Sequence, residues 1–214
     1  YLPYGLSFMM MLFIVGQFHG HHIYHWMTEG IATPGHENYD EVIANKIGYF
    51  GWFWWLRTIL YIIGWLWFTF KLRSNSIAAD KLEVDINNSF HWKNIKLGAW
   101  FMVLFAVTSS TSSWDWLMSI DVHWFSTLYG WYTFAGMWCS TMVVLVLTTL
   151  YLKKLGYLQK VNDSHIHDLG KWTFATSFLW SYLWFSQFML IWYAHIGEEV
   201  IYFQTRIMHF KYLY

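Results

Sequence analysis

The sequence predicts an all-α integral membrane protein with about five membrane-spanning helices in a bundle, and three observations support this prediction. The 214 residues are 57% hydrophobic and only 12% charged, about half the charged fraction of a typical soluble domain. Aromatic residues make up 23% of the chain, including 17 Trp, and Trp and Tyr are enriched where helices meet a membrane interface. Long apolar segments also recur along the chain, separated by polar connections.

Five apolar segments reach the length of about 20 residues that a helix needs to cross a hydrocarbon core of ~30 Å. In chain order these predicted spans are residues 3–26, 48–70, 97–118, 124–152 and 169–194. Five such segments in succession favour membrane helices over the buried core helices of a soluble protein. We treat the whole chain, residues 1–214, as one transmembrane helical domain. Because it begins at Tyr1 without an initiator methionine, we expect it to belong to a longer polypeptide and to be incomplete at both ends.

The charges of the connecting segments predict the orientation of the spans. Residues 71–96 hold five Lys or Arg and residues 153–171 hold four, whereas residues 28–47 hold one Lys beside four acids and residues 119–123 hold no Lys or Arg. Basic and non-basic connections therefore alternate, as five spans require. The positive-inside rule places the two basic connections in the cytoplasm. Residues 28–47, which we call the acidic loop, then face outward, as do residues 115–123 and residues 195–199.

Composition also excludes several classes of function. Thirteen Lys and Arg balance thirteen Asp and Glu, so there is no basic excess for a nucleic-acid partner. The single cysteine, Cys139 in the fourth predicted span, rules out an internal disulfide and a cysteine-ligated zinc or iron–sulfur site within the chain. Phosphate-binding glycine loops, nucleophile elbows and HExxH motifs are absent, which argues against a hydrolase or a nucleotide enzyme.

The first predicted span ends in a histidine-rich segment, His19-Gly-His-His-Ile-Tyr-His25. His21 and His22 lie four and three residues before His25, so one helical face can present two imidazoles. These imidazoles could bind haem or copper, hydrogen-bond a quinol hydroxyl, relay protons near neutral pH, or simply bond to neighbouring helices. Haem is the weakest alternative, because one helix cannot ligate both faces of a porphyrin, and we predict no metal site.

Arg57 lies about ten residues into the second predicted span, near its middle by the rise of about 1.5 Å per residue. A permanent charge there needs an acid or backbone carbonyls facing the bundle interior. Asp115 is a candidate partner. The two residues would form either a structural ion pair or a charge that tunes a proton-carrying acid.

The third predicted span contains a run of six hydroxyl residues that ends close to an acid, Thr108-Ser-Ser-Thr-Ser-Ser-Trp-Asp115. Small hydroxyl residues can serve only to let helices approach closely, but an ionisable group at membrane depth is costly and usually functional. The more specific functional hypothesis is a hydrated proton path that ends at Asp115. Its candidate residues within the run are Ser109, Ser110, Thr111, Ser112 and Ser113.

Two further polar groups follow the run. Asp121 and His123 occupy the outward turn before the fourth span, where they could exchange a proton with bulk water or act as ordinary loop residues, with Asp121 capping the next helix. Beyond the fifth span, Glu198 and Glu199 form an outer acidic pair that is solvated or receives released protons. Inside that span, Gln187 is a lone amide of the kind that joins helices.

Several of these segments together resemble the ActF family of membrane subunits of bacterial alternative complex III. The resemblance rests on Trp114-Asp-Trp-Leu-Met-Ser-Ile-Asp-Val-His-Trp-Phe-Ser126, on His167-Asp-Leu-Gly-Lys171, and on Trp184-Phe-Ser-Gln-Phe-Met-Leu-Ile-Trp-Tyr-Ala194 with the following acids. His22-Ile-Tyr-His-Trp26 and Lys46-Ile-Gly-Tyr49 fit the same family. The resemblance covers most of the chain.

The resemblance implies a place in a quinol:electron-acceptor oxidoreductase complex of a bacterial inner membrane. The ActF family is related to the NrfD and polysulfide-reductase membrane subunits, with helices in four-helix bundles and a chain longer than this one. The resemblance implies no cofactor within this chain, menaquinol or another quinol as the substrate of the complex, and haem c and iron–sulfur clusters in partner subunits. Expected partners are lipids, an ActC-like membrane subunit that holds the quinol site, a multihaem cytochrome c, an iron–sulfur subunit and a terminal oxidase.

Residue by residue, the resemblance implies that the acids and histidines of the family correspond to Asp115, Asp121 and His123, and in part to His22 and His25. The expected function is that of a subunit without redox centres that provides a proton path coupled to quinol oxidation in its partners. Two alternatives remain open from the sequence. The chain could itself bind and oxidise quinol at the histidine cluster, or it could be a structural scaffold.

Overall fold

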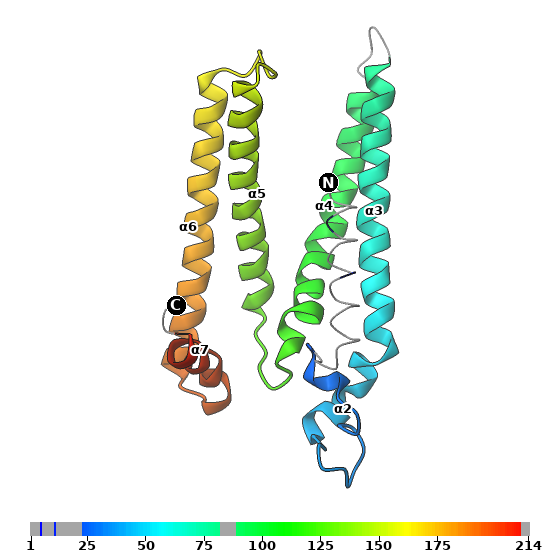
Figure 1. Cartoon of the computed structure of the whole chain (residues 1–214), viewed down its shortest axis with the longest axis vertical. Helices are drawn as coiled ribbons and strands as arrows, with labels where there is room; N and C mark the ends of the chain where they lie inside the picture. The colour runs from blue at the N-terminus through cyan, green and yellow to red at the C-terminus, as the bar shows by residue number, and fades with distance from the viewer. Residues whose placement is uncertain (1–4, 6–10, 12–22, 82–88, 211–214) are drawn as a thin grey trace. The chain divides into compact units, whose positions relative to one another are not determined.

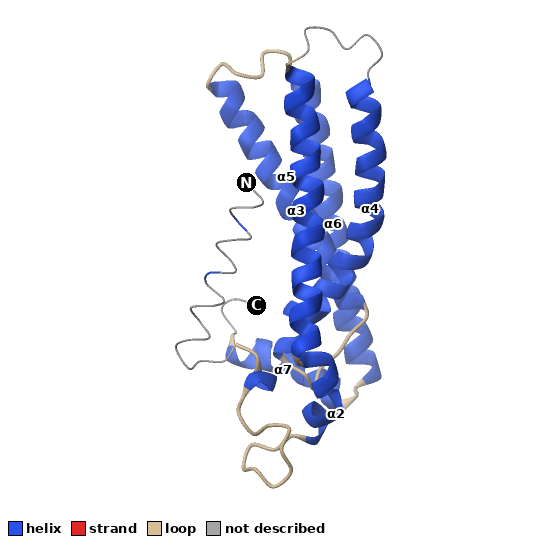
Figure 2. Cartoon of the chain, turned by 90° about the vertical axis from the view of Figure 1, so that its right-hand side faces the viewer, coloured by secondary structure: helices blue, strands red, loops and turns tan. Residues whose placement is uncertain are grey.

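The computed structural model describes residues 23–81 and 89–210, together with residues 5 and 11. Every regular element in these ranges is helical (Figure 1 and Figure 2), which agrees with the all-α prediction. The elements are η1 (His25–Met27), α2 (Glu41–Phe50), α3 (Trp52–Asp80), α4 (Ser89–Trp116), η2 (Met118–Ile120), α5 (Leu128–Lys154), α6 (Asp163–Ala194) and α7 (Gly197–His209). They belong to two units, Tyr1–His123 and Trp124–Tyr214.

Three helical segments among the described residues are long and apolar enough to cross a membrane: α3, α5, and α4 with its extension to Ile120. In the most apolar 18-residue stretch of each helix, the share buried within the protein is only 17% in α3, 6% in α4 and 6% in α5. Such extensive apolar exposure is expected of helices surrounded by lipid or by other membrane helices, whereas it would be unfavourable in water. The transmembrane character predicted from the sequence is therefore supported.

The predicted number of five spans is not confirmed. Of the first predicted span, residues 3–26, the structure describes only residues 5, 11 and 23–26. The fifth corresponds to α6, which has 32 residues but is not among the three candidate spans of the described chain. Its Trp, Tyr, Ser and Gln residues lower its mean hydropathy, although no charged residue occurs between Lys171 and the end of the helix.

In the first unit, α3 and α4 form an antiparallel hairpin joined by polar contacts along its length (Figure 2). The pairing shows that the two helices run in opposite directions. The Trp116 indole donates to the Thr58 hydroxyl at 3.0 Å, and the Trp65 indole donates to the Thr108 hydroxyl at 2.9 Å. Towards the other end, an amide hydrogen bond of 2.9 Å joins Asn75 and Asn94. Because such polar groups have few alternative partners in lipid, these pairs fix the register of the hairpin.

The predicted ends of the second and third spans differ from the helices in an informative way. Gly51 separates α2 from α3, so residues 48–50 belong to a different helix from the span. At the other end, α3 continues to Asp80 and α4 begins at Ser89, well into the polar connection predicted for residues 71–96. The Lys and Arg residues of this connection are good helix formers and extend both helices beyond their apolar parts.

The end of the hairpin next to α2 carries an aromatic core. The Asp40 side chain caps α2 by accepting from the backbone N–H groups of Val42 and Ile43 at 2.9 and 3.3 Å. The ring of Trp26 stacks on Phe50 with 5.4 Å between centroids. The buried residues of this core are Tyr24, Trp26, Ile31, Ile43, Phe50, Trp54 and Val122. This core holds η1, the acidic loop and α2 against the end of α3.

In the second unit, α5 and α6 form another antiparallel hairpin (Figure 1), lined by aromatic pairs. Trp138 lies 6.0 Å from Trp172 and Tyr132 lies 6.0 Å from Trp180, measured between ring centroids. The helices begin at Leu128 and Asp163 rather than at the predicted residues 124 and 169. The early start of α6 follows from its Asn162 capping box. Helix α7, which follows α6, has no counterpart in the sequence-based prediction.

A close contact between α5 and α6 provides a test of this hairpin. A Cβ atom added to Gly136 would lie 2.9 Å from the indole nitrogen of Trp180, so we expect Gly136→Ala to lower the free energy of unfolding by about 1–3 kcal/mol through overpacking. The matched control is Gly170→Ala in α6, where a Cβ atom would meet nothing within 4 Å. Denaturant titrations of both variants in lipid–detergent mixtures measure the difference, and equal stabilities would contradict the packing.

Candidate functional site

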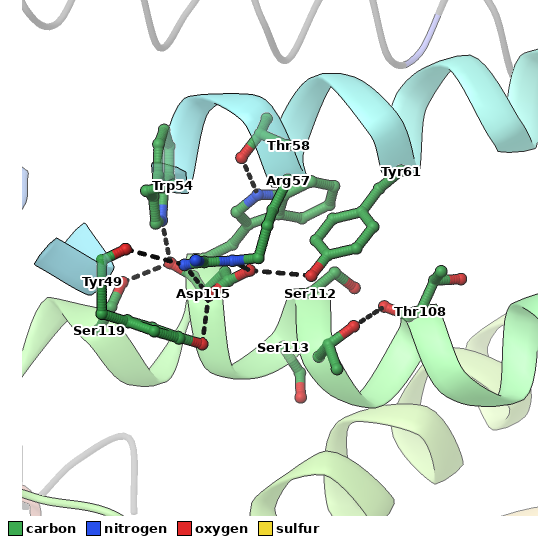
Figure 3. A network of polar contacts seen from close by, with 12 residues as sticks. Tyr49, Trp54, Arg57, Thr58, Tyr61, Thr108, Ser112, Ser113, Asp115 and Ser119 are labelled. Atoms are coloured by element: carbon green, nitrogen blue, oxygen red, sulfur yellow. Dashed lines mark hydrogen bonds and ion pairs between the residues drawn. The ribbon is translucent and has the colours of Figure 1, made fainter. Parts of the chain in front are cut away.

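The candidate site lies where the hairpin of α3 and α4 meets α2 (Figure 3). Asp115 is the penultimate residue of α4. Arg57 is only five residues from the first residue of α3, Trp52, or about 8 Å along the helix axis. Arg57 therefore lies closer to the start of its helix than the predicted ten residues, because the helix begins after Gly51 rather than at residue 48. Both charges lie near one end of the hairpin, where burial of a charge costs less than at the centre of a membrane.

Arg57 and Asp115 form a two-point ion pair, as the sequence suggested they could. The Arg57 Nε and Nη2 atoms donate to Asp115 Oδ2 and Oδ1, each at 2.8 Å. The Asp115 side chain is 0% exposed and that of Arg57 is 13% exposed. Paired, parallel hydrogen bonds of this kind fix the orientation of both groups as well as joining their charges.

Two tyrosine hydroxyls complete the surroundings of the carboxylate. Tyr49 from α2 donates to Asp115 Oδ1 at 2.8 Å, and Tyr61 from α3 donates to Asp115 Oδ2 at 3.0 Å. Each carboxylate oxygen therefore accepts two hydrogen bonds, which fills the usual acceptor capacity of an ionised aspartate. Sequence reasoning missed both tyrosines, and the Tyr-rich composition of the chain gives no signal that selects them.

The backbone of Asp115 and the guanidinium of Arg57 make further contacts. The Asp115 carbonyl accepts from the Trp54 indole at 2.7 Å and from the Ser119 hydroxyl. The guanidinium carbon lies 3.9 Å from the ring centroid of Tyr49 and 4.6 Å from that of Phe53, close enough for cation–π attraction. The site thus links α2, α3, α4 and η2.

The hydroxyl run before Asp115 bonds mainly to its own helix. Thr108 donates to the Leu104 carbonyl at 2.8 Å, and Ser113 donates to the Ser110 carbonyl at 2.7 Å. The other members likewise donate to carbonyls three or four residues earlier; they are Ser109, Ser110, Thr111 and Ser112. One link to the carboxylate exists, because the Tyr61 hydroxyl also interacts with the Thr111 side chain.

None of the hydrogen bonds found for His123 and Asp121 involves the Asp115 carboxylate. The His123 ring instead lies 2.8 Å from Asp40 Oδ2, measured from Nε2, while the His123 backbone N–H donates to Asp121 at 3.2 Å. The alternative that Asp121 caps the next helix is wrong, because the residue before α5 is Thr127 and no side chain caps it. Asp40 was missed, although its position just before an apolar helical segment is a typical capping signal.

Asp40 also carries the clearest electrostatic effect outside the membrane spans. Partial burial by itself would raise the pKa of Asp40, but hydrogen bonds from the Ile43 and Val42 backbone and from His123 outweigh it and hold this pKa below its ordinary value. The ionised form of Asp40 therefore contributes to stability at neutral pH.

The remaining candidate residues are placed only in part. His21 and His22 lie outside the described residues, and His25 is exposed at the start of η1. Glu198 and Glu199 belong to the first turn of α7 rather than to an outward loop, and the Glu199 side chain is half-buried. Within the described ranges, no group of three or more His, Cys, Asp or Glu residues could hold a metal ion.

No protein-family model matches this chain, and no curated protein matches it either.

The ion pair predicts a specific effect on stability. Arg57→Met would leave the buried Asp115 carboxylate without its counter-ion, so we expect the free energy of unfolding to fall by about 3–5 kcal/mol. Adding Asp115→Leu should recover most of this loss, because the unpaired charge is then removed. The control, Arg73→Met at an exposed position of the same helix, should change stability by less than about 0.5 kcal/mol. Similar losses in both single variants would contradict the pairing.

A second prediction concerns acid pH. Because the folded-state pKa of Asp40 is lowered, its ionised form stabilises the fold above pH ~4, and this contribution is lost as the pH falls through the lowered pKa. Asp40→Asn keeps a capping oxygen but removes the charge, so it should cost up to about 1 kcal/mol at pH 7 and nothing at low pH. Unfolding titrations between pH 7 and 3, with Glu37→Gln as control, measure this; a loss independent of pH would refute it.

Proposed function

We propose that this chain is a membrane subunit of a quinol-oxidising respiratory complex and that it provides a proton path coupled to quinol oxidation in partner subunits. The observation that carries the proposal is the buried carboxylate of Asp115, which accepts from two tyrosine hydroxyls at one end of a membrane-spanning hairpin. An ionisable side chain in such a place is most often functional. The segments that resemble the ActF family include this acid.

The surroundings of Asp115 offer a direction for proton movement. A phenolic hydroxyl both donates and accepts hydrogen bonds, so Tyr61 can connect Asp115 to Thr111 and the hydroxyl run. Tyr49 contacts the same carboxylate and is 43% exposed, so its hydroxyl offers the proton a route from the site to the surface of the protein. Water molecules would join the hydroxyls of the run, since these donate to their own helix. In this path Asp115 takes up the proton and Arg57 restores the ionised form afterwards.

The charge pattern gives the sides of the membrane. With five spans, the basic connections between α3 and α4 and between α5 and α6 lie in the cytoplasm. The end of the hairpin that holds Asp115 then faces outward, together with Asp121 and His123. Protons would leave the protein on that side, which in a bacterial inner membrane is the positive side.

The complex supplies the redox chemistry in this proposal. Menaquinol or another quinol is oxidised in an ActC-like membrane subunit, and electrons pass through iron–sulfur clusters and haem c in further subunits towards a cytochrome or a terminal oxidase. The apolar faces of α3, α4 and α5 that this chain leaves exposed suit contacts with such membrane subunits and with lipid.

A purely structural role is the second candidate, and one observation favours it. The Asp115 carboxylate already has four donors, and the hydroxyl run is bonded to its own backbone. Such an arrangement would serve equally to hold α2, α3 and α4 together. The two roles differ in what happens when a hydroxyl is removed while the ion pair remains.

The deciding experiment uses the whole complex reconstituted in vesicles, with quinol-driven electron transfer and protons released per electron recorded together. In the Tyr61→Phe and Asp115→Asn enzymes we expect electron transfer to continue with fewer protons released, because the connection to the hydroxyl run or the carrier itself is lost. The control is Tyr182→Phe, which removes a hydroxyl from an exposed ring of α6.

Each outcome has a distinct meaning. An unchanged proton yield in the folded Asp115→Asn enzyme would eliminate the proton path and leave the scaffold. Loss of electron transfer in Tyr61→Phe, with the complex intact, would instead place this chain at the quinol site.

A further inference from the structure

Helix α7 is attached to the end of α6 by a sharp change of direction. His195 ends α6 in a left-handed conformation, with φ +49°, and α7 begins two residues later at Gly197. Figure 1 shows α7 nearly end-on beside the lower end of α6, whose axis runs vertically in the same view. The axis of α7 is thus close to perpendicular to that of α6.

One face of α7 packs against the hairpin of α5 and α6. Phe203 is buried and meets Phe188 edge-on, with 5.3 Å between ring centroids. Tyr202 stacks on Trp124 at 4.0 Å. Since Phe188 lies six residues before the end of α6, or about 9 Å along its axis, α7 packs against the side of α6 near its end.

The opposite face of α7 carries exposed apolar side chains. Ile201 and Met208 are seven residues apart, so they share a face, and they are 53% and 68% exposed. Gln204 and Thr205 lie between them on this face and are uncharged. Arg206 lies away from this face, with its guanidinium 3.4 Å from the ring centroid of Tyr202.

The neighbouring surface of α6 is also apolar. Leu190, Trp192 and Tyr193, in the last turn and a half of α6, are 63%, 61% and 87% exposed. Helix α6 accompanies the candidate span α5 along an aromatic interface, so these residues lie near a membrane boundary. Exposed Trp and Tyr residues are typical of that depth. The end of α6 and the Ile201–Met208 face of α7 thus both expose large apolar side chains.

We propose that α7 is an interfacial helix that lies in the plane of the membrane and inserts its Ile201–Met208 face at the boundary between lipid headgroups and acyl chains. Helices of this kind bury their apolar face by about 5–10 Å at that boundary. Lipid is the occupant that fits, because α7 crosses the side of α6 instead of covering its tip, and because the adjoining end of α6 exposes Trp192 and Tyr193, residues typical of a membrane boundary. This inference does not depend on the proposed proton path.

Site-directed spin labelling of the full chain in phosphatidylethanolamine–phosphatidylglycerol vesicles tests the proposal. The natural cysteine, Cys139, is first replaced by alanine, and single cysteines are then placed at Ile201 and Met208. Oxygen concentrates in the acyl region and a charged nickel chelate stays in water, so the ratio of their collision rates reports depth. Reference labels at Val144 in the span α5 and at Tyr157 in the connection between α5 and α6, both exposed, give the lipid and water limits.

We expect oxygen to exceed the nickel chelate at Ile201 and Met208, with ratios close to that at Val144. Ratios close to that at Tyr157 would show that this face lies in water and would overturn the proposal. Low access to both reagents would show that protein covers the face, and would overturn it equally. Labels at exposed positions do not disturb the packed face of Tyr202 and Phe203, and the unfolding transition of each labelled chain checks that the fold is retained.

Discussion

The Asp115 carboxylate is fully removed from solvent, and a buried charge is stable only if other groups replace the water it has lost. Arg57, Tyr49 and Tyr61 together provide this replacement. These donors come from α2 and α3, so the charge of one residue in α4 determines how three helices meet. The aromatic core around Trp26 and Trp54 then excludes water from the same end of the hairpin. Structure and candidate chemistry therefore depend on a single ionised group.

Much of the fold followed from composition and hydrophobic length. The helical membrane class and the second, third and fourth spans correspond to α3, α4 and α5. Helix ends were predicted less well, because capping and propensity rather than hydropathy determine them. Helix α3 begins later than predicted because Gly51 separates it from α2. Both helices of the first hairpin extend beyond their apolar parts into the predicted connection, whose lysines and arginines favour helix. Helix α7 was missed because an amphipathic helix of 13 residues does not stand out beside long apolar segments.

The site was predictable in its charges and unpredictable in its neutral partners. Arg57 and Asp115 stand out in a chain with few charges in its apolar segments, and each needs the other. Tyr49 and Tyr61 do not stand out among fifteen tyrosines, since only the three-dimensional arrangement of α2 and α3 selects them. The contact of His123 with Asp40, which is 83 residues away, was likewise not predictable, because only the folded chain brings the two residues together.

The order of the ion-pair residues along the chain has a consequence for biosynthesis. Arg57 is made 58 residues before Asp115, which at about 5–20 residues per second leaves it without its counter-ion for about 3–12 s. During that time the guanidinium can rest only on α2 and on the nearby rings of Tyr49 and Phe53. The ion pair can therefore form only after the end of α4 has been synthesised. The hairpin, rather than the single helix α3, is thus the smallest unit in which the Arg57 charge is paired.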